Sequence, residues 1–544
     1  MNTSVIYRSS IDTNEIARPN LENKPSMISL ILFVVALVAG LAYAAYSILD
    51  DLSVSSHGKP VMNLAPFLLL AVALLIALGF EFVNGFHDTA NAVATVIYTH
   101  SLPPNIAVIW SGFFNFLGVL TSSGLVAFGI ISLLPVELIL QVGSASGFAM
   151  VFSLLIAAMI WNLGTWWLGL PASSSHTLIG SIIGVGVANA LMSGRGGISG
   201  VDWAQVSKVG YSLLLSPMVG FGCTALLLFA MRAFIKNEAL FKEPKKNKAP
   251  PAWIRGLLIL TCTGVSFAHG SNDGQKGMGL IMLILIGCIP TAYALNTSMT
   301  NKHTAAFVAL AEKSSATLSI LAPQSEKATV EPRQVLSEFI RTKEFNSGVI
   351  PALSGMIQNI GNQVKTSGSL AALPTDAITN VRNDMYLASE SIRWIQKNTS
   401  IAATLDHDTN ENLTAFKAEM DRATKFIPLW VKVVVAIALG LGTMVGWKRI
   451  VVTVGEKIGK THLTYGQGAA AELVAMLTIG AADIYGLPVS TTHVLSSGVA
   501  GTMVANGSGM QMSTMRSLAI AWILTLPVAM LLSGGLFWVF SHVF

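Results

Sequence analysis

The chain has 544 residues, of which 52% are hydrophobic and only 11% are charged. So much apolar surface exceeds what the cores of a soluble protein can bury, which excludes the soluble globular class and predicts an integral membrane protein. The formal net charge of +5 does not indicate nucleic-acid binding, because the basic residues gather in two loops.

Apolar stretches follow one another along the chain. They are 27–49, 62–83, 105–132, 147–168, 176–192, 208–235, 254–268, 278–295, 427–447, 465–485, 489–505 and 516–540. Several are shorter or longer than the roughly 20 residues that one helical crossing needs. We therefore expect an all-α, polytopic membrane protein with about ten to twelve transmembrane helices, including broken helices and re-entrant hairpins.

The first apolar stretch differs from a secretory leader. A leader has an apolar core of about 7 to 15 residues behind a basic segment. Here the apolar run is longer, and the residues before it mix basic and acidic side chains. We expect a polar tail at 1–26 and a retained anchor helix with its loop at 27–61.

Basic residues predict the orientation of the chain. Seven Lys or Arg residues lie between Arg232 and Arg255, and a second basic group lies at 448–460. Cytoplasmic loops carry such an excess of positive charge. Both basic segments, including the loop 236–252, are therefore expected on the inner face.

One long polar stretch, 296–426, lies between these two basic segments and carries 13 basic and 13 acidic residues. If both basic segments are inside and one helix follows the stretch, it must emerge on the outer face. Its segment "NDMYLASESIRWIQKN", from Asn383, has apolar residues at helical spacing. The sequence predicts a small, inserted, helical extramembrane domain.

Two motifs each occur twice, in the same order. "GFHDTANA" and "GSNDGQKG" place Asp88 and Asp273 at 185 residues from one another, whereas "GLPASSSHTLIG" and "GLPVSTTHVLSS" place Pro171 and Pro488 at 317. The difference, 317 − 185 = 132, is within one residue of the length of 296–426. We expect a first repeat at 62–235 and a second, inverted repeat at 253–295 and 427–544, because the two are entered from opposite faces.

All four motifs place Gly or Pro beside Ser, Thr, Asn or Asp, so we expect helices to stop at each of them. "LPASSSH" and "LPVSTTH" are typical of helix starts, whose N–H groups and hydroxyls can bind an anion. The donors expected to bind a tetrahedral oxyanion are Ser173, Ser174, Ser175, Ser490, Thr491 and Thr492. The alternative is that these hydroxyls only cap helices or join neighbouring spans.

Asp88 and Asp273 lie in apolar surroundings, where a carboxylate is usually paired, protonated or exposed to a polar cavity. Beside an anion site, such an acid indicates a coupling site for a proton or a sodium ion. Three residues after Asp88 stands Asn91, an uncharged oxygen ligand, but three after Asp273 stands Lys276, whose ammonium can fill the space of a metal ion. His87 adds a titratable group. These residues favour proton coupling.

Four other acidic side chains lie in or near the apolar stretches, and each serine motif also contains a histidine. Glu81 and Glu472 lie inside apolar stretches and are candidates for a functional role, whereas Glu137 and Asp483 lie near expected helix ends. The serine–histidine spacing also allows an intramembrane hydrolase with a nucleophilic triad. That alternative is disfavoured, because catalysis does not need a duplicated set; the histidines serve equally as structural hydrogen-bonding groups. We expect a protein that is not an enzyme and has no resident cofactor or metal.

The motifs "GFHDTANAVAT", "GLPASSSHTLIG", "AHGSNDGQKGMGLIM" and "GLPVSTTHVLSSGVAGTMV" strongly resemble the PiT family of inorganic phosphate transporters. The resemblance covers about 62–295 and 427–541 and is nearest to the bacterial, low-affinity, proton-coupled branch. It implies an inverted-repeat fold and symport of phosphate, often as a neutral complex with a divalent metal. By position it implicates Asp88, Asn91, Asn272, Asp273, Glu472 and the hydroxyls that follow each proline.

The same resemblance implies an inner-membrane protein embedded in the lipid bilayer, and a homodimer. It also marks departures: His87 stands where many members have Asn, and Asn115 stands where the first-half glutamate is expected. Two other functions stay open: a sodium-coupled phosphate or sulfate-type symporter, and a membrane receptor that binds the anion without transport.

Overall fold

The computed structural model describes residues 19–21, 27–55, 64–134, 136–196, 201–245, 248–321, 331–403 and 405–543. Within these residues the regular structure is helical, and one isolated β-bridge joins Gly459 and Met510. The polar tail expected at 1–26 lies outside the described residues, apart from 19–21.

The first part of the chain forms helices α1 to α8. They are α1 (Met27–Ser55), α2 (Leu64–Tyr98), α3 (Pro104–Thr121), α4 (Leu125–Ile131), α5 (Val136–Leu140), α6 (Ala145–Trp167), α7 (Ser174–Met192) and α8 (Trp203–Phe234). The last part forms α17 (Leu429–Thr443), α18 (Lys448–Val452), α19 (Tyr465–Ile484), α20 (Thr491–Ala505) and α21 (Met512–Val543). Between them lie α9 (Ala252–Cys288), α10 (Pro290–Tyr293), α11 (Asn301–Leu321), α12 (Pro332–Thr342), α13 (Val349–Ser367), α14 (Thr375–Lys397), α15 (Thr399–Ala402) and α16 (His407–Thr424).

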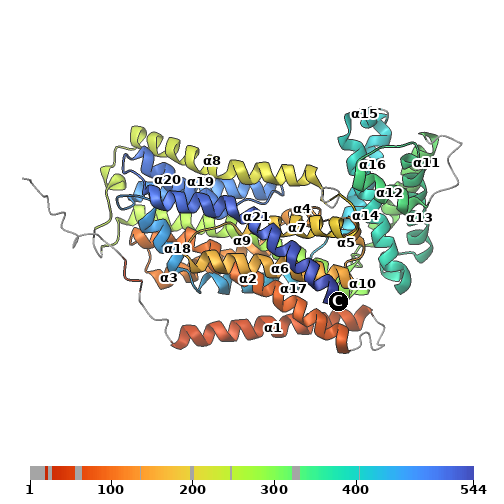
Figure 1. Ribbon diagram of the computed structural model, residues 1–544, viewed down its shortest axis with the longest axis horizontal. Coiled ribbons are helices and arrows are strands. Elements are labelled where there is room, and N and C mark those ends of the chain that lie inside the picture. The colour runs from red at the N-terminus through yellow and green to blue at the C-terminus, as the bar shows by residue number, and fades with distance from the viewer. Residues whose placement is uncertain are drawn as a thin grey trace, which may run out of the picture.

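The described residues contain eight helices long and apolar enough to cross a membrane, or nine if α16 and α17, which are bent by 67°, form one span. The eight are α1, α2, α3, α6, α7, α8, α9 and α21. The shorter or more polar helices α17, α19 and α20 lie in the same bundle (Figure 1). The all-α, polytopic class expected from the composition is confirmed.

The two aspartate motifs do not break their helices, contrary to the sequence expectation. α2 runs through Asp88, and α9 runs through Asp273 as one helix where two apolar stretches were expected. The glycines serve close packing instead. A Cβ atom at Gly85 would lie 2.3 Å from the Leu439 carbonyl oxygen on α17, and one at Gly270 would lie 2.1 Å from the Asn115 carbonyl oxygen on α3.

Helices of the first repeat pack against helices of the second repeat in matching pairs. α3 packs on α9 as α17 packs on α2, and α7 packs on α21 as α20 packs on α8. Gly184 and Gly501, separated by the same 317 residues as the two prolines, occupy matching contacts: added Cβ atoms would lie 2.2 Å from the Met530 and Phe221 carbonyl oxygens. The same kind of helix contact is thus made twice, once by each copy of the duplicated unit.

The central helices α2 and α9 pack together in opposite directions. The end of α2 meets the start of α9, where Arg255 Nε donates a hydrogen bond to the Ser101 carbonyl oxygen at 2.9 Å. The other end of α9 leads toward the inserted helices (Figure 1). This antiparallel pair is the geometric basis of the inverted-repeat fold.

Helices α11 to α16 form a separate cluster at one end of the bundle, while α18, with Lys448 and Arg449, lies at the other end (Figure 1). The cluster has its own apolar core, in which the Phe307 and Phe416 rings lie 5.2 Å apart. Its contacts with the bundle include a hydrogen bond from buried Arg382 to the Ile139 carbonyl oxygen at 3.3 Å.

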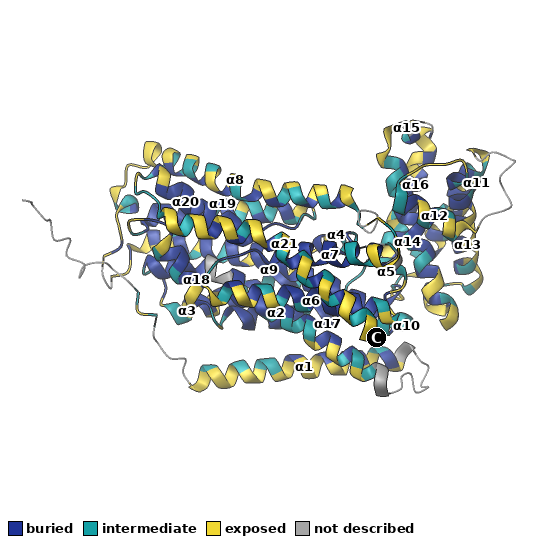
Figure 2. Ribbon diagram, viewed as in Figure 1, coloured by how far each residue is buried: buried dark blue, intermediate teal, exposed yellow. Residues whose placement is uncertain are grey.

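Burial follows the position of each helix in the membrane bundle. α1 is exposed along most of its length, whereas the inner helices α7 and α9 are mostly buried (Figure 2). Every described residue from Ala268 to Ile286 on α9 is buried, including Asp273 and Lys276. The polar residues of interest therefore lie in the protein interior and not on the lipid-facing surface.

Candidate functional site

Two helices begin inside the bundle at the serine motifs, as the sequence predicted. Ser173 caps α7, where its hydroxyl accepts a hydrogen bond from the His176 amide at 3.2 Å, and Ser490 caps α20 by accepting from the His493 amide at 3.1 Å. Both chain turns pass through a glycine with positive φ, +68° at Gly169 and +63° at Gly486, a conformation that favours glycine. The capping alternative thus accounts for the first hydroxyl of each motif.

The two helix starts lie against one another. Ser175 Oγ donates a hydrogen bond to the Val489 carbonyl oxygen at 2.7 Å, and the His176 and His493 rings are 4.6 Å apart. His493 also stacks on Trp522 at 4.1 Å. Motifs that are 317 residues apart in the chain therefore form one polar region.

The Asp88 carboxylate lies between the two motifs. Its Oδ2 accepts a hydrogen bond from Ser174 Oγ at 2.8 Å, and its Oδ1 accepts one from Thr492 Oγ1 at 2.7 Å. His87 Nδ1 lies 3.0 Å from the same Oδ1, while His87 Nε2 lies 3.0 Å from Thr165 Oγ1. One acid from α2 thus joins hydroxyls of both repeats.

The Asp273 carboxylate has a different set of neighbours. Lys276 Nζ lies 2.7 Å from Asp273 Oδ2, and His269 Nε2 lies 3.4 Å from it. His269 Nδ1 in turn lies 2.9 Å from the Asn115 side-chain oxygen. Ligand atoms of Asp88, His269 and Asp273 all lie within 4.8 Å of one another. The two acids of the repeats therefore meet in one cluster.

The repeat offset shows how the two acids differ. Ser174 corresponds to Thr491, and Thr492 corresponds to Ser175, because each pair is 317 residues apart. Among the described residues Thr491 Oγ1 has no hydrogen-bond partner, and Ser175 bonds a backbone carbonyl instead of Asp273. Asp273 is therefore paired with the Lys276 ammonium, whereas Asp88 accepts hydrogen bonds from hydroxyl groups.

Two further predicted ligands are Asn272 and Asn91. Asn272 donates through Nδ2 to the Leu487 carbonyl oxygen at 3.0 Å, and its Oδ1 is buried without a partner. The side chain of Asn91, like that of Glu137, lies outside the described residues. Asn272 thus connects the second aspartate motif to the second serine motif.

Sequence comparison identifies the family. The family model described as the phosphate transporter family matches residues 84–533. The chain belongs to the phosphate transporter family. The low-affinity inorganic phosphate transporter PitA of Escherichia coli strain K12 is 42% identical over 501 residues, covering 88% of this chain and 97% of that protein. PitB of the same strain, also named a low-affinity inorganic phosphate transporter, is 42% identical over 492 residues, covering 87% and 96%.

A solved structure titled "The sodium-dependent phosphate transporter" is 20% identical and covers 88% of this chain and all of that one, with a TM-score of 0.47. The chain itself is a phosphate transporter and not an enzyme, which removes the hydrolase alternative. With its bacterial relatives and its apolar helices, it is a multi-pass protein of the inner membrane.

Glu472 lies in the interior of the transporter, as its apolar surroundings suggested. Thr95 on α2 and Thr261 on α9 both donate hydrogen bonds to its carboxylate, the second at 2.5 Å. Its hydrogen bonds thus join α19 to the two central helices without including Asp88 or Asp273. Asn115, at the place of the expected first-half glutamate, bonds His269 and Thr443 instead.

Sequence reasoning missed Asp483. This side chain, expected at a helix end near water, accepts hydrogen bonds from Ser271 Oγ and Gln275 Nε2, each at 2.6 Å. Both donors flank Asp273 in the transporter's second aspartate motif. One signal was available in the sequence. Asp483 stands three residues before the second "GLP" turn, so it lies at the end of α19 that leads into the second serine motif.

Several buried polar atoms around this cluster have no hydrogen-bond partner within the described part of the transporter. They include Thr491 Oγ1, Asn272 Oδ1, His176 Nδ1, His493 Nε2 and Asp273 Oδ1. Buried polar groups are nearly always hydrogen-bonded, so unpaired ones in an interior cluster indicate a ligand or water. The region therefore has donors and acceptors left for a small polar ligand.

Proposed function

We propose that this transporter imports phosphate together with protons and that Asp88 links the two. The observation that carries the proposal is the pair of hydrogen bonds from Ser174 and Thr492, one from each repeat, to the Asp88 carboxylate. A charged carboxylate holds these hydroxyls strongly. Protonation weakens that hold, so the hydroxyls become able to donate to a phosphate oxygen. Proton binding and phosphate binding then favour each other.

The unpaired groups support a phosphate site at the same place. Thr491 is the repeat counterpart of Ser174, and its unpaired hydroxyl adds a donor from the second repeat. Two helix starts supply N–H groups and the positive ends of their dipoles. Neutral donors of this kind bind an oxyanion without a fixed charge, which favours release on the other side of the membrane.

The position of Lys276 favours a proton over a sodium ion as the coupling ion. Its ammonium is fully buried and pairs with Asp273 at 2.7 Å, so the second acid already has a cation attached to the chain. A sodium ion at that acid would have to displace a covalently held positive charge. The remaining acid, Asp88, has His87 beside it as a second group able to exchange protons.

We further propose that phosphate can enter as a neutral complex with a divalent metal, in which case the metal is part of the substrate. Moving an unpaired anion into a low-dielectric interior is costly, and a neutral complex lowers that cost. If this holds, chelating divalent metals outside the vesicles should reduce uptake, and restoring them should recover it.

Uptake of labelled phosphate into proteoliposomes tests the coupling ion. In sodium-free buffer, an acid-outside pH gradient should drive accumulation, and a sodium gradient without a pH gradient should not. Accumulation that requires sodium would contradict the proposal. Empty vesicles are the control for leak.

Competition with unlabelled anions tests the substrate class in the same vesicles. Excess phosphate should block the labelled signal, whereas sulfate should block it poorly, because only phosphate can donate a hydrogen bond to a carboxylate at neutral pH. Equal competition by sulfate would indicate a broader oxyanion transporter. Binding without any flux would instead indicate a receptor.

The homodimer implied by the family resemblance stays a prediction. Light scattering of the purified transporter in detergent, with the detergent mass subtracted, would distinguish one copy from two.

A further inference from the structure

The inserted domain contains a pocket whose lining residues lie outside the Asp88 cluster. It lies where the end of α12 meets the end of α14 and the start of α15, and it has a volume of about 220 Å³. Its walls are Phe339, Lys343, Trp394, Lys397, Asn398 and Ile401. The lining combines aromatic surface with two lysines and includes no acidic side chain.

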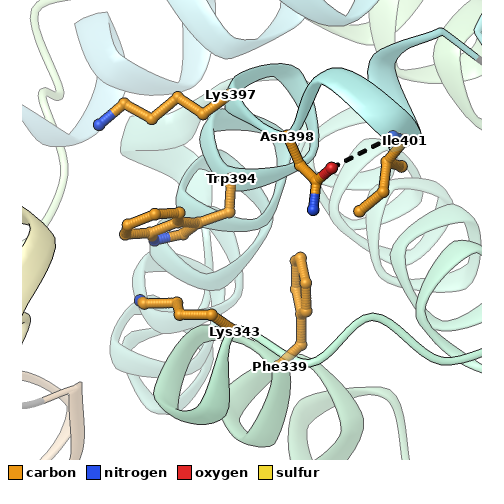
Figure 3. Close-up of a pocket in the computed structure, with 6 residues that line it drawn as sticks. All are labelled: Phe339, Lys343, Trp394, Lys397, Asn398 and Ile401. Atoms are coloured by element: carbon orange, nitrogen blue, oxygen red, sulfur yellow. Dashed lines mark hydrogen bonds between the residues drawn. The ribbon is translucent and has the colours of Figure 1, made fainter.

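Three cationic side chains surround one indole ring in this pocket. Lys343 Nζ lies 3.9 Å from the centre of the Trp394 ring, Lys397 Nζ lies 5.1 Å from it, and the Arg393 guanidinium carbon lies 4.9 Å from it. Figure 3 shows the Trp394 indole between the two lysine side chains, with Phe339 and Asn398 on the other side of the pocket. The aromatic ring thus holds the positive charges close together.

The carboxylates nearby do not neutralise all of this charge. Arg393 pairs with Glu390 at 2.5 Å and with Asp202 at 3.5 Å. Lys343 donates a hydrogen bond to the Ile340 carbonyl oxygen but reaches a carboxylate, that of Asp202, only at 4.0 Å, and the described residues form no ion pair with Lys397. Two acids therefore face three cations, and the two lysines that line the pocket are the ones left poorly paired.

The pocket also has neutral donors. Trp394 Nε1 is buried and has no hydrogen-bond partner in the described part of the chain, and an indole N–H can only donate. Asn398 also lies in the pocket wall (Figure 3) and uses its side-chain oxygen to accept from the Ile401 amide at 3.3 Å. A ligand for this set of groups must accept several hydrogen bonds and carry negative charge.

We propose that this pocket binds a phosphate group, either of inorganic phosphate or of a phospholipid head group. A phosphate presents several acceptor oxygens and up to two negative charges, so it can bridge Lys343 and Lys397 and accept from the Trp394 indole. The inference is independent of the coupling ion, because none of the lining residues belongs to the Asp88 cluster.

The position of the pocket connects it to the membrane bundle. Asp202, which approaches Lys343 and Arg393, is the residue whose side chain caps α8 by accepting from the Gln205 amide at 3.2 Å. α8 packs on α20, which begins at the second serine motif. A bound phosphate competes with Asp202 for these cations and so acts directly on the start of α8.

Binding measurements on the full-length transporter in nanodiscs test the proposal. In discs of zwitterionic lipid, titration with inorganic phosphate should show one more binding site for the parent protein than for Lys343→Ala/Lys397→Ala. In the second arm, anionic phosphatidylglycerol should co-purify with the parent and be lost from the same double variant, as measured by native mass spectrometry.

Matched variants separate charge from folding. Lys302→Ala/Lys313→Ala removes two exposed lysines from α11 of the same domain and should behave like the parent. Lys343→Arg/Lys397→Arg keeps both charges and should retain binding. A difference in either arm supports the site and identifies its source. Identical phosphate stoichiometry and identical lipid retention in the parent and the alanine variant would overturn it.

Discussion

The Lys276 ammonium lies 2.7 Å from the Asp273 carboxylate, and both side chains are fully buried. In the first repeat the equivalent acid, Asp88, instead receives hydroxyl donors from Ser174 and Thr492. The duplicated fold thus presents the same acid twice, once with a permanent cation and once with exchangeable neutral donors. This asymmetry is why we propose Asp88 as the acid that changes its partners during transport.

Replacing Asp88 with Asn should abolish uptake driven by a pH gradient. The amide cannot bind and release a proton as a carboxylate does. Its nitrogen would also face the hydroxyls of Ser174 and Thr492 as a second donor. Uptake into proteoliposomes should fall to the level of empty vesicles while the protein still inserts and purifies as a folded species. Normal gradient-driven uptake by the variant would remove Asp88 from the coupling step.

Lys276→Met should destabilise the transporter by about 3–5 kcal/mol, because it leaves the Asp273 carboxylate buried without its partner. Thermal unfolding in detergent measures the loss. The double variant Asp273→Asn/Lys276→Met removes both charges and should recover much of the stability. If the single and double variants unfold alike, the ion pair is not what stabilises this region.

Lys276→Asn tests ion choice separately from stability. It removes the attached cation and supplies an oxygen ligand of the kind that Asn91 offers in the first repeat. Phosphate uptake by this variant should become stimulated by sodium, whereas uptake by the unchanged transporter should not. Sodium-independent uptake at the original rate would show that Lys276 does not exclude sodium.

Gly270→Ala should destabilise the bundle by at least about 1–3 kcal/mol, the usual range for overpacking a core. The added Cβ would lie 2.1 Å from the Asn115 carbonyl oxygen, and rigid backbone cannot move aside easily. Gly256→Ala on the same helix is the matched control, since no described atom beyond the neighbouring turns of its own helix lies within 4 Å of its Cβ position. Equal melting temperatures for both variants would contradict the close packing of α9 on α3.

Phosphate binding to the pocket of the inserted domain should weaken as the pH rises above about 8. Burial, together with the nearby Arg393 and Lys397, lowers the pKa of Lys343 to about 8, although Asp202 and Glu390 act in the opposite direction. The ammonium that binds the anion is therefore present below that pH and lost above it. Titrations at pH 7 and pH 9 should differ for the parent and not for Lys343→Arg.

The repeated motifs allowed the proximity of their polar residues to be predicted, because equal offsets require equal places in the two halves; the roles of these residues in binding stay predictions. That reasoning brought Asp88, Asp273 and the serine motifs together correctly. It was wrong about helix breaks at the aspartate motifs. A glycine that permits close approach of two helices looks, in sequence, like a glycine that ends one.

The exact partners in contacts between distant helices had no signal in the sequence, even where, as at Asp483, the position of a residue did. The hydrogen bonds from Thr95 and Thr261 to Glu472 join three helices at isolated threonines, which are common inside membrane helices. The bonds from Ser271 and Gln275 to Asp483 depend on where α19 ends relative to α9. Such partners follow from packing geometry, which local spacing does not encode.

The most direct test of the central claim is to count the protons taken up when phosphate binds at Asp88. Isothermal titration of phosphate into the purified transporter, repeated in buffers of different ionisation enthalpy, gives that number. It should be carried out on Lys343→Ala/Lys397→Ala, so that the inserted domain does not contribute. The Lys343→Ala/Lys397→Ala transporter should take up more protons for each phosphate bound than the same double variant that also carries Asp88→Asn. Equal proton counts for the two would contradict the central claim.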